Sequence, residues 1–443
     1  MQVELSGHYG YGRIVRTMFP MVMMMIVISV YSIVDGFFIS NYAGSSAFAG
    51  MNLIWPAIAL VGALGMMVGS GGSALVSKTI GEGDPEKARR IFSMLIRVTI
   101  AAGVVLAVLL FIFMPQVASF LGSDDEMMPY AVSYGRILIT VLPGYMLQTA
   151  FQPFFMAAEK PELGTRLSLI CGVTNILLDA LFVAVFGWGL TGAAWASSIG
   201  LLVGGFFPLW YFSSKKNDTL LWIVPCKVDW KSVLKSCTNG LSEFVGNIAM
   251  NIIGICYNWQ LMAYIGADGV SAYGIILYLG FLFAAVFIGY NMGITQIIAY
   301  NYGAGNHQEM RSLLHKSIVL VLVFGLIIVG AAELTAPAVV KAFVGYDRVL
   351  SEISLNGLRV YMLSFLICGV NMFTSAWFTA LNNGTISAAA AFLRTLVFEM
   401  AAVFVLPPLF GVEGIWMSVN VAEVLSLIVS IALIASFRKR YEY

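Results

Sequence analysis

The chain has 443 residues, of which 60% are hydrophobic and only 11% are charged, and its mean hydropathy is +0.88. These values lie far outside the range of soluble globular proteins, so we expect a polytopic membrane protein. The net charge of +1 and the dispersed basic residues argue against a nucleic-acid partner.

Apolar runs long enough for an α-helix to cross a hydrocarbon core of about 30 Å recur along the whole chain. We predict an all-α fold with twelve transmembrane helices at residues 14–40, 50–76, 91–115, 130–156, 164–185, 192–213, 238–264, 272–298, 313–334, 354–380, 386–408 and 414–436. The first run is too long for the core of a signal peptide and should be retained as a span.

The orientation follows from the Lys and Arg residues, because positively charged loops stay in the cytoplasm. With both termini inside, most basic residues fall in cytoplasmic loops, and the exceptions gather after the ninth span, at Lys341, Arg348 and Arg359. We therefore expect a multi-pass protein of the cytoplasmic membrane with both termini in the cytoplasm.

The longest polar stretch separates six predicted spans from six. It divides the chain into an N-terminal six-helix lobe at 1–213, a cytoplasmic linker at 214–237 and a C-terminal six-helix lobe at 238–443. A shift of 222 residues also places Gly81-Glu82-Gly83 on Gly303-Ala304-Gly305. Other loops align at the same shift, which indicates an internal duplication. Because each repeat has an even number of spans, the lobes should be related by a pseudo-twofold axis along the membrane normal.

Two aspartates, Asp35 and Asp179, lie inside apolar runs, where an ionised carboxylate is costly and often marks an ion pathway. Asn175 precedes Asp179 by one helical turn, so both side chains share a helix face and can close around one cation. Asp179 and Ser197 each lie nine residues from Trp188, at the centre of a turn, and Asp35 lies at a similar depth. A membrane aspartate can also simply hydrogen-bond a neighbouring helix.

The repeat provides an internal control, because a residue needed only for the fold should tend to recur in both halves. At the 222-residue shift, Asp35, Asn175, Asp179 and Ser197 correspond to Tyr257, Val397, Ala401 and Val419, in that order. The polar cluster therefore belongs to the first half alone, which favours a function over a purely structural role.

The chain resembles transporters of the multidrug and toxic compound extrusion (MATE) family over essentially its whole length. The resemblance is carried by Pro20 and Asp35, by Gly69-Ser70-Gly71-Gly72-Ser73 with Gly81-Glu82-Gly83-Asp84, by Asn175 with Asp179, and by Gly192-Ala193-Ala194-Trp195-Ala196-Ser197. It implies twelve helices in two lobes and the exchange of external Na⁺ or H⁺ for organic, often cationic, compounds.

The resemblance also implies that Asp35, Asn175, Asp179 and Ser197 bind the coupling cation, with Ser197 where the family has Thr. These side chains offer hard oxygen ligands for Na⁺, and a buried carboxylate can instead take up a proton, so the residues leave both ions open. Pro20 should kink the first helix, and we hypothesise that this kink lets the helix bend when Asp35 changes its ligand.

The second half has its own polar candidates for substrate binding, at Glu243, Tyr257, Gln260, Arg394 and Glu399. Glu399 and Glu423 lie at one depth, where they could attract a cationic substrate or pair with Arg394 in a structural network. Glu243 lies nearer the cytoplasm than the other candidates of its helix.

We predict a cation-coupled exporter of amphipathic compounds that works by alternating access. A flippase for a lipid-linked sugar would need more Arg and Lys in its cavity, and a receptor or assembly protein would not need clustered intramembrane carboxylates. The sequence lacks a phosphate-binding Gly-Lys-Ser/Thr loop and a paired catalytic nucleophile, so we expect no enzyme. No cofactor is expected beyond the transported ion, and we expect a monomer.

Overall fold

The computed structural model describes residues 4–42, 45–345 and 347–443, and all regular elements within them are helical. The first half contains α1 (Tyr11–Tyr42), α2 (Ser45–Gly81), α3 (Pro85–Phe120), α4 (Met128–Thr140), α5 (Leu142–Ala157), α6 (Pro161–Asp179), the π-helix η1 (Ala180–Val185) and α7 (Gly189–Ser213). The predicted all-α class is confirmed.

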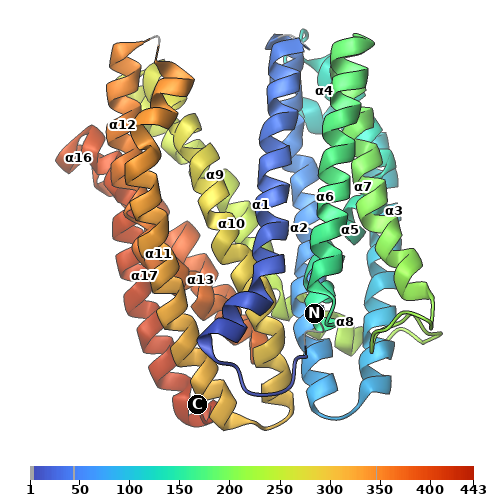
Figure 1. Cartoon of the computed structure of the whole chain (residues 1–443). Coiled ribbons are helices and arrows are strands. Elements are labelled where there is room, and N and C mark those ends of the chain that lie inside the picture. The colour runs from blue at the N-terminus through green and yellow to red at the C-terminus, as the bar shows by residue number, and fades with distance from the viewer. Residues whose placement is uncertain (1–3, 43–44, 346) are drawn as a thin grey trace.

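After the short helix α8 (Trp230–Asn239), the second half repeats this order, with two short helices added after its π-helix. It contains α9 (Leu241–Ile265), α10 (Ala267–Gly303), α11 (His307–Val344), α12 (Arg348–Met362), α13 (Phe365–Ala380), α14 (Gly384–Phe392), the π-helix η2 (Leu393–Phe398), α15 (Glu399–Val405), α16 (Pro407–Phe410) and α17 (Val412–Tyr441). Two lobes stand side by side in Figure 1, blue to green for the first and yellow to red for the second.

Ten helical segments in the described chain are long and apolar enough to cross a membrane, and the pair α12 and α13, bent by 46°, makes an eleventh. The remaining predicted span, 130–156, is divided between α4 and α5, which meet at Val141. Pro143 lies two residues further on, and because proline lacks an N–H it leaves the carbonyl four residues earlier without its helical partner.

The end of the predicted linker is helical, since α8 begins at Trp230 after an Asp229 cap. The Asp229 carboxylate accepts hydrogen bonds from the Ser232 hydroxyl at 2.6 Å and from the backbone N–H of Lys231 at 3.1 Å. The Ser232 bond is the main reason that the pKa of Asp229 lies below its ordinary value. Asn239, the last residue of α8, donates to the backbone oxygen of Gly71 at 3.3 Å. The lobe boundaries at 213 and 238 remain a prediction.

The lobes meet toward the lower end of the molecule in Figure 1. Both chain termini and the α2–α3 and α10–α11 turns lie at this end. We call this the termini end. A Cβ on Gly81 would lie 2.1 Å from the backbone oxygen of Tyr300, and one on Gly303 would lie 2.0 Å from that of Lys78. The 222-residue shift converts one of these contacts into the other. This reciprocity is what a pseudo-twofold axis between the lobes requires.

Polar groups reinforce the contact between the lobes in the same region. The Gln296 amide on α10 accepts a hydrogen bond from Ser77 at 2.9 Å and donates one to Ser73 at 2.8 Å, both on α2. All three side chains are buried. Because an unpaired amide would be costly there, separating α2 from α10 requires these bonds to be replaced.

The segment before α1 forms a second bridge between the lobes. The backbone N–H of Leu5 donates to Glu159, after α5, at 2.7 Å, and that of Tyr9 donates to Glu309 of α11 at 2.8 Å. His8 contacts the other Glu309 oxygen at 2.8 Å. The carboxylate of Glu309 is nearly buried, so this segment fastens the two lobes together at the termini end.

Candidate functional site

The four first-lobe candidates come together from three helices. Asp35 lies on α1, Asn175 and Asp179 lie one turn apart near the end of α6, and Ser197 lies on α7. The Asn175 amide donates to the Ser197 hydroxyl at 3.4 Å, and that hydroxyl donates to an oxygen of Asp35 at 3.5 Å. The carboxyl groups of Asp35 and Asp179 lie close enough to interact directly.

Small residues let α7 approach α6 and η1 closely enough for this arrangement. A Cβ on Gly192 would touch the backbone of Phe182 at 3.0 Å, and one on Gly200 would lie 3.6 Å from the backbone oxygen of Cys171. Asp179 is the last residue of α6, and the π-helix η1 starts at the next residue. Single π-turns inside α-helices frequently occur at functional sites because they alter the direction of the side chains around them.

Three oxygen atoms of the cluster have no hydrogen-bond partner within the described residues: Oδ1 of Asn175 and both carboxylate oxygens of Asp179. Asp179 is fully buried, and Asn175 is 4% exposed. A buried acceptor without a partner costs about 1–3 kcal/mol, and a charged one costs more. A bound cation or proton would compensate for all three atoms, which is the best physical reason to regard the cluster as a cation site.

The ligand types limit which ion the cluster can take. Its potential ligands are carboxylate, amide and hydroxyl oxygens, which suit a hard cation, whereas transition metals prefer imidazole or thiolate ligands. The described residues contain no group of three or more His, Cys, Asp or Glu side chains arranged for a metal. Na⁺ and H⁺ both fit the oxygen set.

Neighbouring polar residues that the sequence analysis did not select surround the cluster. Tyr134 of α4 is almost completely buried and lies within electrostatic range of both aspartates. Tyr31 of α1 lies near Asp35 and contacts Gln148 of α5, whose buried Oε1 lacks a hydrogen-bond partner in the described structure. A glutamine inside an apolar span was visible in the sequence, whereas tyrosines are too common in membrane proteins to stand out.

In the second lobe, Arg394 forms a buried ion pair with Glu423, with its Nη2 and Nε atoms 2.7 and 2.8 Å from Oε1. Asn371 of α13 donates to the other carboxylate oxygen of Glu423 at 2.6 Å. The Ser430 hydroxyl donates to Asn371 at 2.9 Å. Arg394 therefore pairs with Glu423, as one of the two interpretations of the sequence expected, and its part in substrate binding remains a prediction.

The remaining second-lobe candidates separate into two groups. Tyr257 and Glu399 lie within interaction range of each other. Glu243, in the first turn of α9, and Gln260, one turn after Tyr257, do not join them through any hydrogen bond or ion pair that the described residues make. Fourteen residues separate Glu243 from Tyr257, roughly 21 Å along a helix.

Pro20 lies inside α1, which continues through it as one helix. Its backbone oxygen accepts a hydrogen bond at 2.6 Å from the hydroxyl of Thr165 on α6, a contact that ties the two helices together below the aspartates. The proposed bending of α1 at Pro20 remains a prediction.

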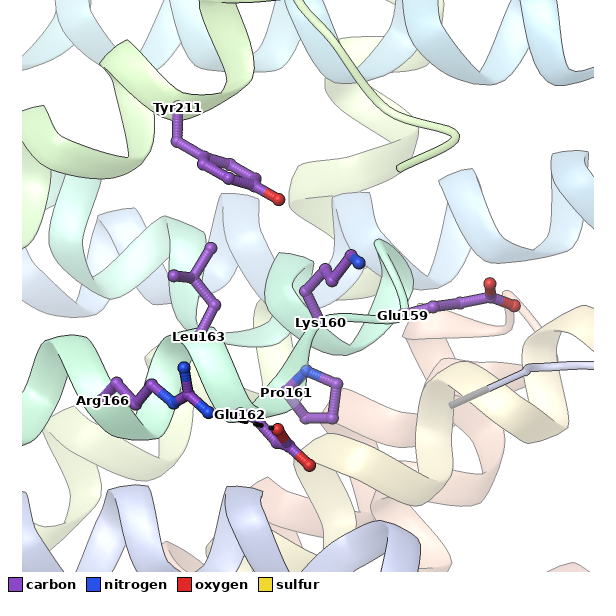
Figure 2. A pocket seen from close by; sticks show the side chains of 7 residues that line it. All are labelled: Glu159, Lys160, Pro161, Glu162, Leu163, Arg166 and Tyr211. Atoms are coloured by element: carbon purple, nitrogen blue, oxygen red, sulfur yellow. Dashed lines mark ion pairs between the residues drawn. The ribbon is translucent and has the colours of Figure 1, made fainter. Parts of the chain in front are cut away.

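A surface pocket of about 320 Å³ lies away from this cluster, around the start of α6 (Figure 2). It is lined by Glu159, Lys160, Pro161, Glu162, Leu163, Arg166 and Tyr211. Glu162 and Asp179 are seventeen residues apart on α6, roughly 25 Å. The pocket is therefore separate from the candidate ion site.

Comparison with known proteins gives the family. The sequence profile of the MatE family matches residues 20–181 and, a second time, residues 244–405. The chain is 26% identical over 425 residues to the multidrug export protein MepA of Staphylococcus haemolyticus (strain JCSC1435), covering 95% of this chain and 92% of that protein. It is 24% identical over 421 residues to MepA of Staphylococcus aureus (strain NCTC 8325 / PS 47), with the same coverage.

Solved structures share the fold. An outward-facing conformation of a multidrug resistance MATE family transporter superimposes with a TM-score of 0.93 at 21% identity, covering 99% of this chain and 98% of that one. A transporter of the MOP superfamily from Pyrococcus furiosus, described as having a binding pocket of reverse polarity, gives a TM-score of 0.90 at 21% identity with the same coverage. The two-lobe fold, the repeated profile match and the full-length similarity agree: the chain belongs to the MatE family of transporters, and it is not an enzyme.

Proposed function

We propose that this protein is an antiporter that exports amphipathic, often cationic, organic compounds in exchange for Na⁺ or H⁺. The observation that carries the proposal is the set of buried oxygen atoms without partners on Asn175 and Asp179, next to Asp35. Such a set is unfavourable unless a cation or proton binds there, and the binding free energy can then bias a conformational change. The export of drugs by the MepA relatives supports the choice of cargo.

The two lobes are the rigid units that would move relative to each other during transport. The structure has them packed together at the termini end through Gly81, Gly303 and Gln296. With both termini in the cytoplasm, as the basic loops favour, this is the state closed to the cytoplasm. An external cation would bind between Asp35 and Asp179, substrate would leave, and the lobes would rock so that the next substrate binds from the inside.

Coupling requires the cation and the substrate to favour opposite states or to compete for one state. Ser197 links Asn175 to Asp35 across three helices, so a cation that draws the two aspartates together also draws α1 toward α6 and α7. This movement is the step by which occupancy of the site would reach the interface between the lobes.

The test uses purified protein in vesicles loaded with a cationic dye. An inward Na⁺ gradient and an inward H⁺ gradient are imposed separately, and the rate of dye movement is recorded for each. Acceleration by one of the gradients is expected and identifies the coupling ion. Movement of the dye that depends on neither gradient would refute the antiport proposal.

A further inference from the structure

The pocket at the start of α6 contains two cationic side chains that the rest of the protein hardly uses. Lys160 precedes the helix and forms no ion pair with any other residue that the structure describes. The side chain of Arg166 is 76% exposed and approaches Glu162 only at 3.8 Å. Because so long and exposed a pair contributes little, both cations are available to an anion.

The other polar groups of the pocket leave its interior with a positive charge. Glu159 accepts the backbone N–H of Leu5 at 2.7 Å, and Figure 2 shows its side chain extending away from Tyr211 and Arg166. Tyr211 reaches from α7 toward Lys160 (Figure 2), and its hydroxyl makes no hydrogen bond within the described chain. Two cations against the one carboxylate of Glu162 leave a charge of +1, together with a phenol O–H donor. These are groups that bind phosphate oxygens.

An apolar stripe on α6 begins at this pocket. Arg166, Ile170, Val173 and Leu177 follow one another at spacings of four, three and four residues, so they lie on one face of the helix. The three apolar side chains are each more than half exposed. This segment is long and apolar enough to cross a membrane, so its exposed face meets the hydrocarbon chains of the lipids.

Trp210 lies at the level where the membrane surface is expected. It is 71% exposed in the last turn of α7, next to Tyr211, and its ring packs against Phe207 with centroids 5.7 Å apart. Tryptophan is enriched where a membrane protein passes through the lipid headgroups. The pocket lies between this turn and the start of α6, so it is at headgroup level, with the apolar stripe running from it into the membrane.

We propose that this pocket binds the phosphate group of an anionic phospholipid. Lys160, Arg166 and the Tyr211 hydroxyl hold the phosphate, and an acyl chain lies along Ile170, Val173 and Leu177. Basic pockets between transmembrane helices are suited to acidic headgroups, and each basic residue contributes about 1 kcal/mol. The site goes beyond the proposed function, because it recognises a membrane lipid and lies apart from the candidate ion site.

The test is native mass spectrometry of the full-length protein titrated with dioleoylphosphatidylglycerol, an anionic lipid, and with dioleoylphosphatidylcholine, a zwitterionic one. The double variant Lys160→Gln, Arg166→Gln should bind phosphatidylglycerol about tenfold more weakly and phosphatidylcholine almost unchanged. The matched control, Lys341→Gln with Arg348→Gln, removes the same charge at exposed positions outside the pocket and should bind both lipids like the wild type. Arg166→Lys keeps the charge and should retain most of the affinity, which separates loss of charge from loss of folding.

Inorganic phosphate, added against chloride at equal ionic strength, distinguishes a lipid from a soluble phosphate compound. It should not displace phosphatidylglycerol, because the acyl chain on α6 adds to the affinity. Displacement would assign the pocket to a soluble phosphate compound and overturn the proposal. Unchanged phosphatidylglycerol binding in the pocket variant, or an equal loss in the control variant, would also overturn it. The binding is measured without any gradient, so failure of antiport in vesicles would not alter its interpretation.

Discussion

The reciprocal glycine contact at the termini end should control how completely the lobes close. In Gly303→Ala, the new Cβ would lie 2.0 Å from the backbone oxygen of Lys78, and in Gly81→Ala it would lie 2.1 Å from that of Tyr300. Cβ atoms essentially never approach a heavy atom this closely, and a backbone oxygen within a helix cannot rotate away. In either variant α2 and α10 must therefore separate by about 1 Å, a form of overpacking that costs roughly 1–3 kcal/mol.

A cost of this size shifts a two-state equilibrium by roughly 5- to 150-fold. Alanine is the better helix former by about 0.5–1 kcal/mol, so a loss of closure cannot result from weakening of the helices. Gly274→Ala, on α10 with nothing within 4 Å of the new Cβ, is the matched control. It should leave closure unchanged.

The assay measures the distance between spin labels at two exposed positions near the turns, Lys87 of α3 and Gln308 of α11. In Gly303→Ala and Gly81→Ala the distance distribution should shift toward longer separations, and gradient-driven transport should fall. If Gly303→Ala gives the same distribution as Gly274→Ala, the contact does not limit closure and this reasoning is refuted.

Three further variants probe other contacts. Glu309→Gln should weaken the bridge before α1. Because hydrogen bonds to charged groups contribute about 1.5–3 kcal/mol, amide exchange at residues 4–10 should accelerate about tenfold. Unchanged exchange would contradict the bridge. Glu423→Gln should destabilise the protein by about 3 kcal/mol, because it leaves Arg394 without its counter-charge. Replacing both residues by methionine should restore most of the melting temperature. Equal losses of stability in the single and the double variant would argue against an ion pair. Ser197→Ala should lower the apparent affinity for the coupling cation about tenfold in transport titrations, whereas Ser197→Thr should leave it unchanged. If both variants have the same affinity, the hydroxyl is not part of the site.

The sequence predicts most of the architecture, because each helix that crosses a hydrocarbon core needs an apolar run of the matching length. Apolar length identifies the spans, and the repeat predicts the relation that Gly81 and Gly303 display in their contacts. The break at Val141 was missed although Pro143 marks it, since the apolar run continues through both helices. The π-helices could not be foreseen, because they depend on packing and not on composition.

The first-lobe cluster was accessible from the sequence because depth can be counted from the turns. That count puts Asp35, Asn175, Asp179 and Ser197 at one level, and the structure brings them together. Counting cannot show which helices are neighbours, so Tyr134 was not foreseen.

In the second lobe, the sequence left the role of Arg394 open between substrate binding and a structural pair. The geometry around Glu423 shows the pair, because Asn371 and Arg394 together occupy its carboxylate. A part for Arg394 in substrate binding remains a prediction. The orientation in the membrane, the coupling ion and the monomeric state remain predictions.

The central claim is that Asp35 and Asp179 hold the coupling cation. The most direct test is the movement of that cation, recorded as ²²Na⁺ flux or as a pH change inside vesicles, when a gradient of cationic substrate is imposed. The wild type and Asp268→Asn, which alters an exposed aspartate at the start of α10, should move the cation. Asp35→Asn and Asp179→Asn should fold but move none. Cation movement at wild-type rates in both site variants would contradict the account.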